Sequence, residues 1–409
     1  MIASQNNIPK LRFPEFSDAW VVKKLGKMAE FKAGYAFKSE QMLSEKSNFQ
    51  LLKMSNVYKN ELRLDRNSSY WESINDKEKE FLLKEGDTIL TLTGTVGKQD
   101  YGYSIQIKEN NKYLLNQRLV LLREIQNVSC NDFISQLISN EKFLFYFFGE
   151  AKGGTGNQTN VGTEDVKNIQ LFFPTLPEQQ KIATFLSTVD EKLQALKKKK
   201  SLLETYKKGV MQKIFSQQIR FKNDEGNDFE DWEVKKLGEI SIIAMGQSPS
   251  SNSYNSDNIG TPLIQGNADI QNRLSSPRNW TTEITKECKI GDLILTVRAP
   301  VGAVAKSIHN ACIGRGVCAI SNTSDSNIEY IYQFLLDYET KWGSLEQGST
   351  FTAVSGVEIK KLEINLPTLP EQTKIANFLT AIDEKITKVD FQIKQTELWK
   401  KGLLQQMFV

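Results

Sequence analysis

The sequence predicts an α+β protein made of two related globular domains, each followed by a long α-helix. Three observations predict this: a long helical segment occurs twice, the segments before the two helices are also related, and those segments begin with strand-like runs. We expect the first domain at 1–175, its helix at 176–216, the second domain at 217–368 and its helix at 369–409.

The duplicated helix reads LPEQQKIATFLSTVDEKLQAL from Leu176 and LPEQTKIANFLTAIDEKITKV from Leu369, 193 residues later. Each copy opens on a proline, which the first turn of a helix tolerates because its missing N–H would have no partner there. Both helix starts are therefore well defined by the sequence.

Apolar residues follow in both copies at alternating steps of four and three. The seam is interrupted only at Lys200 and Lys207 in the first copy and at Thr396 and Lys400 in the second. An average period of 3.5 requires a partner helix. The first helix would be about 57 Å long at 1.5 Å per residue, so the two helices are expected to pair with each other as a spacer.

The repeat extends beyond the helices. The motif W-x-x-x-x-L-G occurs at Trp20 and again at Trp232. Two further pairs match in order: LLKMSNVYKNEL from Leu51 with LIQGNADIQNRL from Leu263, and GDTILTLTGTVG from Gly86 with GDLILTVRAPVG from Gly291. A period of roughly 200 residues is too long for a solenoid, so the chain is a tandem duplication of a domain and its helix.

Each globular segment begins with strands and ends with helices. GDTILTL and GDLILTV are turn residues followed by short β-branched runs, which is typical of strands after tight turns. Helical periodicity appears later, around Cys130–Phe148 and Asn327–Trp342, and is followed by the loops GGTGNQTNV and QGSTFTAV. A short apolar segment then leads into each long helix, so each domain is α+β.

Composition is that of an ordinary globular protein, with 39% hydrophobic and 25% charged residues in 409. The longest apolar run, Phe143–Phe148, is far short of the roughly 20 residues of a membrane span, and the N-terminus has no signal-peptide core. We expect a soluble, cytoplasmic protein that does not bind membranes. The four cysteines lack CxxC spacing, which disfavours disulfides and thiolate metal sites.

No catalytic constellation is recognisable. The one histidine, His309, lies in a polar stretch and is expected to be structural or on the surface. The glycines of 153–160 follow a helix and lack the lysine of a phosphate-binding loop. The carboxylate pairs Asp190-Glu191 and Asp383-Glu384 are interpreted as solvated helix surface. The run Lys197–Lys200 could be a DNA-binding patch, but a solvated coiled-coil face is the favoured interpretation.

Two related domains on a stiff spacer suit the reading of two separated sites on a polymer. The W-x-x-x-x-L-G, GD-x-I-L and G-x-V-G motifs, VRAPVG, the duplicated LPEQ-x-K-I-A-x-F-L and the closing K-K-G-x-x-Q-x-x-F from Lys207 and Lys400 occur in order. Through them nearly the whole chain resembles the DNA sequence-specificity subunit of type I restriction-modification enzymes. Each motif alone is weak, but their repeated order is specific.

This resemblance implies a non-catalytic DNA reader in a host-defence system. Each globular unit would be a target recognition domain for one half of a bipartite target in double-stranded DNA, and the helices would pack antiparallel as a ruler. Two modification subunits would methylate adenine, and two restriction subunits can join them. S-adenosylmethionine, ATP and Mg²⁺ would lie on those partners, with no cofactor in this chain.

Candidate DNA-binding residues follow from the side chains that read base edges and phosphates. In the first domain they are Lys53, Ser55, Asn56, Thr93, Lys98, Gln117, Arg118, Asn157, Gln158 and Thr159; in the second they are Gln265, Asn267, Arg298, Arg315, Ser349, Thr350 and Thr352. The alternative is that these are ordinary polar loops. Leu92 stands where many relatives have an arginine, so no contact is expected there. Differences between the two sets predict a non-palindromic target.

The starts of the two helices are candidate docking surfaces for the modification subunits. The residues concerned are Pro177, Glu178, Gln179, Pro370, Glu371 and Gln372. A plain N-terminal capping role is the alternative for the same residues.

Two other classes of function remain open at this stage. A single-chain restriction-methylation enzyme is disfavoured because the chain is short and lacks methyltransferase and nuclease motifs. A coiled-coil adaptor would bury its domain loops in protein partners and would not bind DNA. Salt-dependent DNA binding by the chain or its methyltransferase complex distinguishes the reader from the adaptor.

Overall fold

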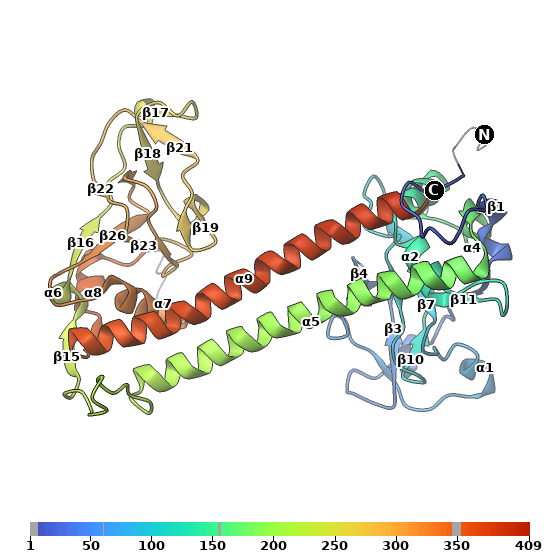
Figure 1. Ribbon diagram of the computed structural model, residues 1–409, viewed down its shortest axis with the longest axis horizontal. Helices are drawn as coiled ribbons and strands as arrows, with labels where there is room; N and C mark the ends of the chain where they lie inside the picture. Colours follow the sequence, from blue (N-terminus) through green and yellow to red (C-terminus); the bar gives the residue numbers. More distant parts are fainter. Residues whose placement is uncertain (1–6, 60, 154–156, 346–352) are drawn as a thin grey trace. The chain divides into compact units, whose positions relative to one another are not determined.

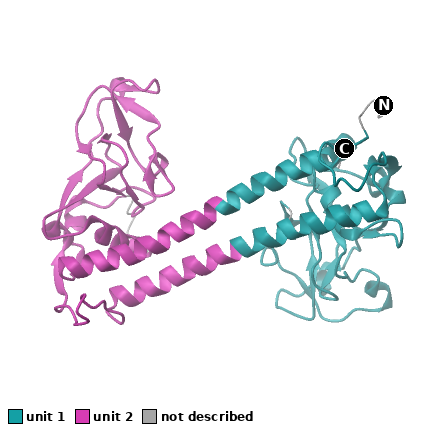
Figure 2. Ribbon diagram, in the orientation of Figure 1, with its two compact units in different colours: residues 1–196, 392–409 teal, residues 197–391 magenta. Residues whose placement is uncertain are grey.

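The structure is a computed structural model that describes residues 7–59, 61–153, 157–345 and 353–409. The chain forms two compact units: unit 1 comprises residues 1–196 and 392–409, and unit 2 comprises residues 197–391. The two long helices are α5 (Leu176–Phe215) and α9 (Leu369–Met407). Each changes colour along its length in Figure 2, because its two halves belong to different units. Each unit therefore contains one globular portion and parts of both helices, which confirms the predicted fold class.

Unit 1 is built around the four-stranded antiparallel sheet β2-β11-β7-β9 and the three-stranded sheet β10-β3-β6 (Figure 1). Its strands are β1 Val21–Lys24, β2 Ala29–Ala33, β3 Phe49–Leu52, β4 Val57–Tyr58, β5 Glu61–Leu62, β6 Tyr70–Trp71, β7 Thr88–Thr91, β8 Thr93–Thr95, β9 Ser104–Gln106, β10 Tyr113–Leu115, β11 Leu119–Glu124, β12 Lys152–Gly153, β13 Gln158–Asn160 and β14 Gln170–Phe173. Its short helices are α1 Asp76–Lys79, α2 Asn131–Ile138, α3 Glu141–Gly149 and α4 Thr163–Asn168, with 3₁₀ turns η1 Leu25–Lys27, η2 Ser39–Gln41 and η3 Met54–Asn56.

Unit 2 repeats this plan with a six-stranded sheet, β16-β26-β23-β24-β20-β19, and a five-stranded sheet, β17-β21-β18-β25-β22. Its strands are β15 Glu233–Lys236, β16 Ser241–Met245, β17 Tyr254–Asn255, β18 Thr261–Ile264, β19 Ile270–Gln271, β20 Leu274–Ser275, β21 Asn279–Thr281, β22 Glu287–Cys288, β23 Leu293–Thr296, β24 Val304–Lys306, β25 Ala311–Ile313, β26 Val317–Asn322 and β27 Glu363–Leu366. Its helices are α6 Leu237–Ile240, α7 Ile328–Leu345 and α8 Gly356–Lys361, with η4 Ser251–Ser253 and η5 Asn267–Asp269.

Strand pairing shows that the two units have one topology. In unit 1, β11 lies antiparallel between β2 and β7, and β10 pairs in parallel with β3. In unit 2, β26 lies antiparallel between β16 and β23, and β25 pairs in parallel with β18. The sequence repeat is thus a repeat of tertiary structure.

The repeated Gly-Asp dipeptide makes the turn that starts the central strand. Gly86 and Gly291 have φ of 88° and 95°, the left-handed conformation that glycine adopts without strain. Asp87 then accepts a hydrogen bond from the backbone N–H three residues upstream at 2.8 Å, and Asp292 does the same at 2.7 Å. The dipeptide therefore sets the strand entry locally in both units.

The lysines that interrupt the apolar seam of the two long helices form ion pairs with aspartates of the other helix. In unit 2, Lys200 pairs with Asp390 at 2.5 Å and Lys207 pairs with Asp383 at 2.7 Å. Seven residues forward on α5 match seven residues backward on α9, so the helices are antiparallel in this unit. In unit 1, Lys400 pairs with Asp190 at 2.6 Å.

The interpretation of Asp190 and Asp383 as solvated surface was wrong. Each accepts a hydrogen bond from a glutamine of its own unit as well as from a seam lysine: Gln136 donates to Asp190 and Gln333 to Asp383, both at 2.9 Å. A carboxylate between the helix pair and the globular portion compensates the lysine charge, which local periodicity does not reveal. Lys200, the last of the four consecutive lysines, also belongs to the seam.

Candidate functional site

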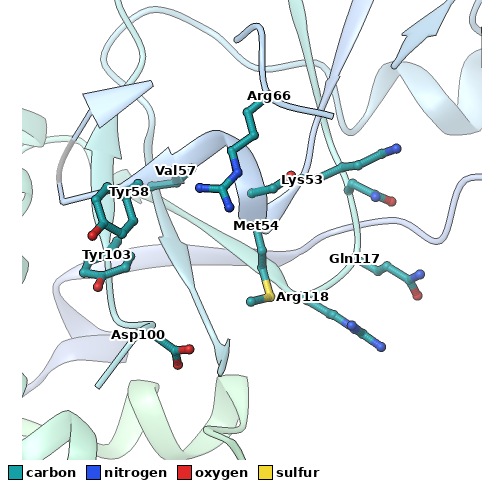
Figure 3. A pocket seen from close by; sticks show the side chains of 11 residues that line it. Lys53, Met54, Val57, Tyr58, Arg66, Asp100, Tyr103, Gln117 and Arg118 are labelled. Atoms are coloured by element: carbon teal, nitrogen blue, oxygen red, sulfur yellow. The ribbon is translucent and has the colours of Figure 1, made fainter. Parts of the chain in front are cut away.

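A cavity of about 580 Å³ in unit 1 collects several of the predicted reading residues. Lys53, Ser55, Gln117 and Arg118 all line it, and Figure 3 shows the labelled side chains around it. Lys53 and Ser55 follow β3, whereas Gln117 and Arg118 follow β10. Because β3 and β10 are parallel neighbours, their carboxyl ends lie at the same edge of the sheet, which brings the two segments together.

Backbone hydrogen bonds fix the segment after β10. The N–H of Asn116 donates to the carbonyl of Leu52 at 3.3 Å, and that of Gln117 donates to Tyr35 at 2.9 Å. Arg118 has φ of 70°, which is unusual for a residue other than glycine, asparagine or aspartate. The turn leaves the side chains of Gln117 and Arg118 exposed.

A second hollow continues this surface. Thr93, Asn157 and Gln158 line it together with Arg118. Strand β8 pairs with β13, with Gly94 opposite Thr159 and Thr93 opposite Asn160. Asp100 and Arg118 border both hollows, so four segments that lie far apart in sequence share one polar surface.

The glycine turn beside Thr93 is held by Asp100. Its carboxylate accepts the backbone N–H and the hydroxyl of Thr95, both at 2.7 Å, and these hydrogen bonds hold the pKa of Asp100 below its usual range. A lowered folded-state pKa means that this contribution to stability is present above the unfolded pKa and is lost as pH falls through the folded one. Lys98 lies exposed on the same turn.

Four predicted residues of unit 1 have side chains with internal partners. Lys53 Nζ donates to the Ser69 hydroxyl at 2.5 Å. Asn56 is fully buried: its Oδ1 accepts from the N–H of Lys53, and its Nδ2 donates to the carbonyls of Arg63 and Arg66. Thr93 is 7% exposed and donates to Asn160 at 3.3 Å, and Thr159 donates to a backbone carbonyl. Burial therefore gives Asn56 the role of organising the loop, and a DNA contact by its side chain is not expected.

The sequence reasoning missed an aromatic and cationic wall of the same cavity. Tyr58 and Tyr103 pack edge to face at 5.2 Å, and Arg66 lines the cavity beside them. The guanidinium of Arg63 lies 3.9 Å from the centre of the Tyr58 ring. Burial, followed by the neighbouring Tyr58, raises the pKa of the Tyr103 hydroxyl. The signal was present as one tyrosine, Tyr58, followed within eight residues by Lys59, Arg63 and Arg66.

In unit 2 the equivalent strand ends carry Gln265 and Arg315. The N–H of Arg315 donates to Ser248 at 3.2 Å, and Gln265 Nε2 donates to the Tyr254 hydroxyl at 2.9 Å. Arg298 is joined to this edge because the N–H of its neighbour Val297 donates to the carbonyl of Gly316. Asn267, Arg298 and Arg315 are exposed. The candidates Ser349, Thr350 and Thr352 lie outside the described residues.

The ten arginines of the chain divide by position. Five are ion-paired: Arg12 with Glu178, Arg123 with Asp87, Arg220 with Glu371, Arg273 with Glu339 and Arg278 with Asp269. The other five, Arg63, Arg66, Arg118, Arg298 and Arg315, have no carboxylate partner among the residues that the structure describes. All five belong to the two candidate surfaces, where a polyanion could supply the missing partner.

The helix starts are built differently from the prediction. Glu178, Gln179, Glu371 and Gln372 are each at most 1% exposed, so their side chains are not docking surfaces. Gln179 Nε2 donates to the carbonyl of Pro174 at 3.1 Å, and Gln372 donates to that of Pro367 at 2.9 Å. Of the predicted residues, only Pro177 and Pro370 are exposed.

Each glutamate belongs to a clamp with a tryptophan and an arginine. Trp20 Nε1 donates to Glu178 at 3.2 Å, and Arg12 donates to both carboxylate oxygens at 2.7 Å. In unit 2, Trp232 donates to Glu371 at 2.9 Å and Arg220 donates to it at 2.9 and 3.4 Å. The repeated tryptophan and the repeated LPEQ glutamate, far apart in sequence, are thus partners, and neither helix is simply capped by this side chain.

The single histidine and the four cysteines all lie in the globular portions of the two units. His309 Nδ1 lies 2.7 Å from the Ser275 hydroxyl, a structural contact. All four cysteines are free thiols, and burial raises the pKa of Cys318 to about 12. Across the described ranges, no group of three His, Cys, Asp or Glu residues is arranged to hold a metal ion, and no helix is long and apolar enough to cross a membrane.

Comparison with known proteins gives one consistent result. Residues 17–205 and 229–396 match the family described as type I restriction modification DNA specificity domain. A protein assigned as the MjaX type I restriction enzyme specificity subunit of Methanocaldococcus jannaschii is 29% identical, covering 98% of this chain and 95% of that protein. The MjaIX specificity subunit from the same organism is 32% identical over 47% of this chain and 46% of its own length.

Solved structures agree on the fold. The crystal structure of a type I restriction-modification S subunit from M. genitalium has a TM-score of 0.65 and 14% identity, covering 98% of this chain and 99% of that one. A chain from a structure of a type I restriction-modification system has a TM-score of 0.58 and 20% identity, covering 95% of this chain and 97% of that one. With two matched domains spanning most of its length, the chain belongs to the family of type I restriction-modification DNA specificity subunits.

Proposed function

We propose that this chain reads a bipartite, asymmetric, gapped target in double-stranded DNA, one half-site with each unit, and positions two adenine methyltransferase subunits on it. The chain itself is non-catalytic, and restriction subunits can join the complex. S-adenosylmethionine, ATP and Mg²⁺ then belong to those partners. The observation that carries the proposal is that all five arginines without a described carboxylate partner belong to the candidate surfaces, with Arg63, Arg66 and Arg118 in unit 1 and Arg298 and Arg315 in unit 2.

Different side chains at equivalent positions support two different half-sites. Pairing of β11 and β26 with their neighbours aligns Gln117 with Arg315 and Arg118 with Gly316. Arginine suits the O6 and N7 of guanine, whereas glutamine suits the N6 and N7 of adenine. A surface that exchanges these residues between units cannot read the same bases twice, which supports a non-palindromic target.

The paired helices are the proposed ruler. Their antiparallel register is locked within unit 2 by Lys200 with Asp390 and Lys207 with Asp383. A rigid pair of helices suits a fixed gap between half-sites because its length changes only in steps of 1.5 Å per residue. The exposed prolines Pro177 and Pro370 at the two equivalent helix starts remain candidate contacts for two copies of a modification subunit.

Methylation-sensitive genome sequencing of the host with and without this gene tests the function directly. Loss of one asymmetric, gapped motif carrying methyladenine on both strands, and its return on complementation, is the expected result. If an adenine methyltransferase co-purifies with the chain and no methylation changes, the reading function is wrong. A complex that shows no salt-dependent DNA binding would instead favour the adaptor.

Replacing the residues after β10 should relax recognition of one half-site only. The variant Gln117→Ala with Arg118→Gly keeps a residue that tolerates positive φ, and glycine is what unit 2 has at that place. We expect a loss of about 1 to 3 kcal/mol of discrimination at each base that was read. The methylated motif should become degenerate in one half and stay unchanged in the other.

Arg315→Ala is the reciprocal variant and should relax the opposite half-site. Lys27→Ala, which removes an exposed charge of unit 1 away from both hollows, is the control and should leave the motif as it is. If Gln117→Ala with Arg118→Gly and Arg315→Ala relaxed the same half-site, the assignment of one half-site to each unit would be contradicted.

A further inference from the structure

We propose that Arg63 and Arg66 of unit 1 bind the phosphate backbone of the first half-site, and that Tyr58 holds Arg63 in place for this. The proposal rests on the proposed DNA-reading function and deepens it, because it separates the groups that contact phosphates from those that read bases. Neither arginine was identified from the sequence.

The loop that carries both arginines is held by hydrogen bonds from two side-chain amides to its backbone carbonyls. Asn56, fully buried, donates from Nδ2 to the carbonyl of Arg63 at 2.9 Å and to that of Arg66 at 2.7 Å. Gln50 Nε2 donates to the carbonyl of Leu64 between them at 2.6 Å. These bonds use the backbone of the loop alone, so its shape is fixed while the arginine side chains stay free to bind a ligand.

The two guanidinium groups are ordered without an acidic partner. Arg63 stacks on the Tyr58 ring, which Tyr103 and, at 5.3 Å, the Lys59 ammonium also contact. Arg66 reaches into the cavity that Lys53 also lines (Figure 3). No carboxylate of the described residues forms an ion pair with Arg63 or Arg66. Holding a guanidinium by an aromatic face leaves its N–H groups unused, and these match the oxygens of a phosphate.

The corresponding loop of unit 2 is arranged in the opposite way. Its buried anchor is Asp269, which accepts the N–H of Gln265 at 2.8 Å as Asn56 accepts that of Lys53. The Asp269 carboxylate also pairs with the nearby Arg278 at 2.9 Å. The other arginine of this unit 2 loop, Arg273, pairs with Glu339, so both arginines of that loop have acidic partners whereas Arg63 and Arg66 of unit 1 have none among the described residues.

A contact to phosphate and a contact to a base have different signatures. Losing a phosphate contact weakens binding to every sequence equally and lowers the dependence of affinity on salt, whereas losing a base contact relaxes the motif. Phosphate is the better match here because both arginines lie on one loop, whose carbonyls at Arg63 and Arg66 are held by the same Asn56 amide, and a guanidinium binds phosphate oxygens through paired N–H groups.

The test uses the full chain purified with its co-expressed methyltransferase. The variant is Arg63→Gln with Arg66→Gln, and the charge-matched control is Lys27→Gln with Lys79→Gln, two exposed lysines of the same unit. Dissociation constants are measured at several salt concentrations, on a duplex carrying both half-sites and on one with the first half-site scrambled. Circular dichroism confirms that each variant is folded.

We expect the double arginine variant to bind both duplexes roughly tenfold or more weakly at low salt, with the magnitude of the slope of log K against log salt reduced by about two. Its methylated motif should be unchanged, and Tyr58→Phe, which keeps the ring, should behave like the parent. A relaxed first half-site would overturn the proposal in favour of base reading, and an unchanged slope would overturn it outright. If the parent complex itself showed no salt-dependent binding, the DNA-reading function, and not this assignment alone, would fail.

Discussion

Glu178→Ala is expected to destabilise unit 1 by about 3 to 5 kcal/mol, because it leaves a buried guanidinium without its counter-charge. Arg12 has a side chain 10% exposed, and Glu178 is 1% exposed. The same substitution removes the acceptor of Trp20 Nε1, one of the largest fully buried side chains of the chain. Arg12 cannot avoid this cost by losing its proton, because a guanidinium keeps its charge even without a carboxylate partner.

Hydrogen-deuterium exchange resolved by peptide is the suitable measurement, since a chain of two units has no single unfolding free energy. Faster exchange should be confined to unit 1, around the first turns of α5 and the core that contains Trp20. Glu371→Ala should do the same in unit 2, to a smaller extent because Arg220 is 23% exposed. Glu191→Ala, an exposed glutamate of the same helix, is the control; equal protection in Glu178→Ala and Glu191→Ala would contradict the clamp.

Inserting one heptad into both long helices should lengthen the gap of the methylated motif by roughly three base pairs. Seven residues add about 10 Å of helix, and B-DNA rises 3.4 Å per base pair. The matched sites are between Leu203 and Glu204 in α5 and between Ile386 and Thr387 in α9. A heptad keeps the seam in phase, and both ion pairs that bracket these sites, of Lys200 and Lys207, are retained.

The motif is determined by methylation-sensitive sequencing in a strain that carries the variant as its only copy. An unchanged gap in an active variant would refute the ruler. The insertion in α5 alone is the control: it displaces Lys207, which is 9% exposed, from Asp383. An unpaired buried charge costs about 3 to 5 kcal/mol, so methylation should fall without a new motif appearing.

The sequence alone was sufficient for the architecture. A 4-3 apolar pattern after Leu-Pro-Glu-Gln predicted helices from 176 and 369, and the structure begins them at Leu176 and Leu369. The Gly-Asp turns at Gly86 and Gly291 marked the central strands for a local reason, since glycine accepts positive φ and the aspartate closes the turn. Helix periodicity and tight turns depend on residues only a few positions apart, so a single sequence is enough to predict them.

What a polar side chain does was decided only by tertiary structure. Asn56 and Lys53 are near neighbours in a polar loop, yet Asn56 is fully buried as a loop anchor while Lys53 lines the cavity. The sequence around Glu178 is typical of a solvated helix start, yet Glu178 is buried and accepts a hydrogen bond from Trp20, more than 150 residues upstream. Exposure depends on which distant strands and helices pair, and side-chain type at a local period does not encode that pairing. The sequence by itself therefore determined the duplicated scaffold, and the long-range contacts determined which polar groups are anchors and which remain free for a partner.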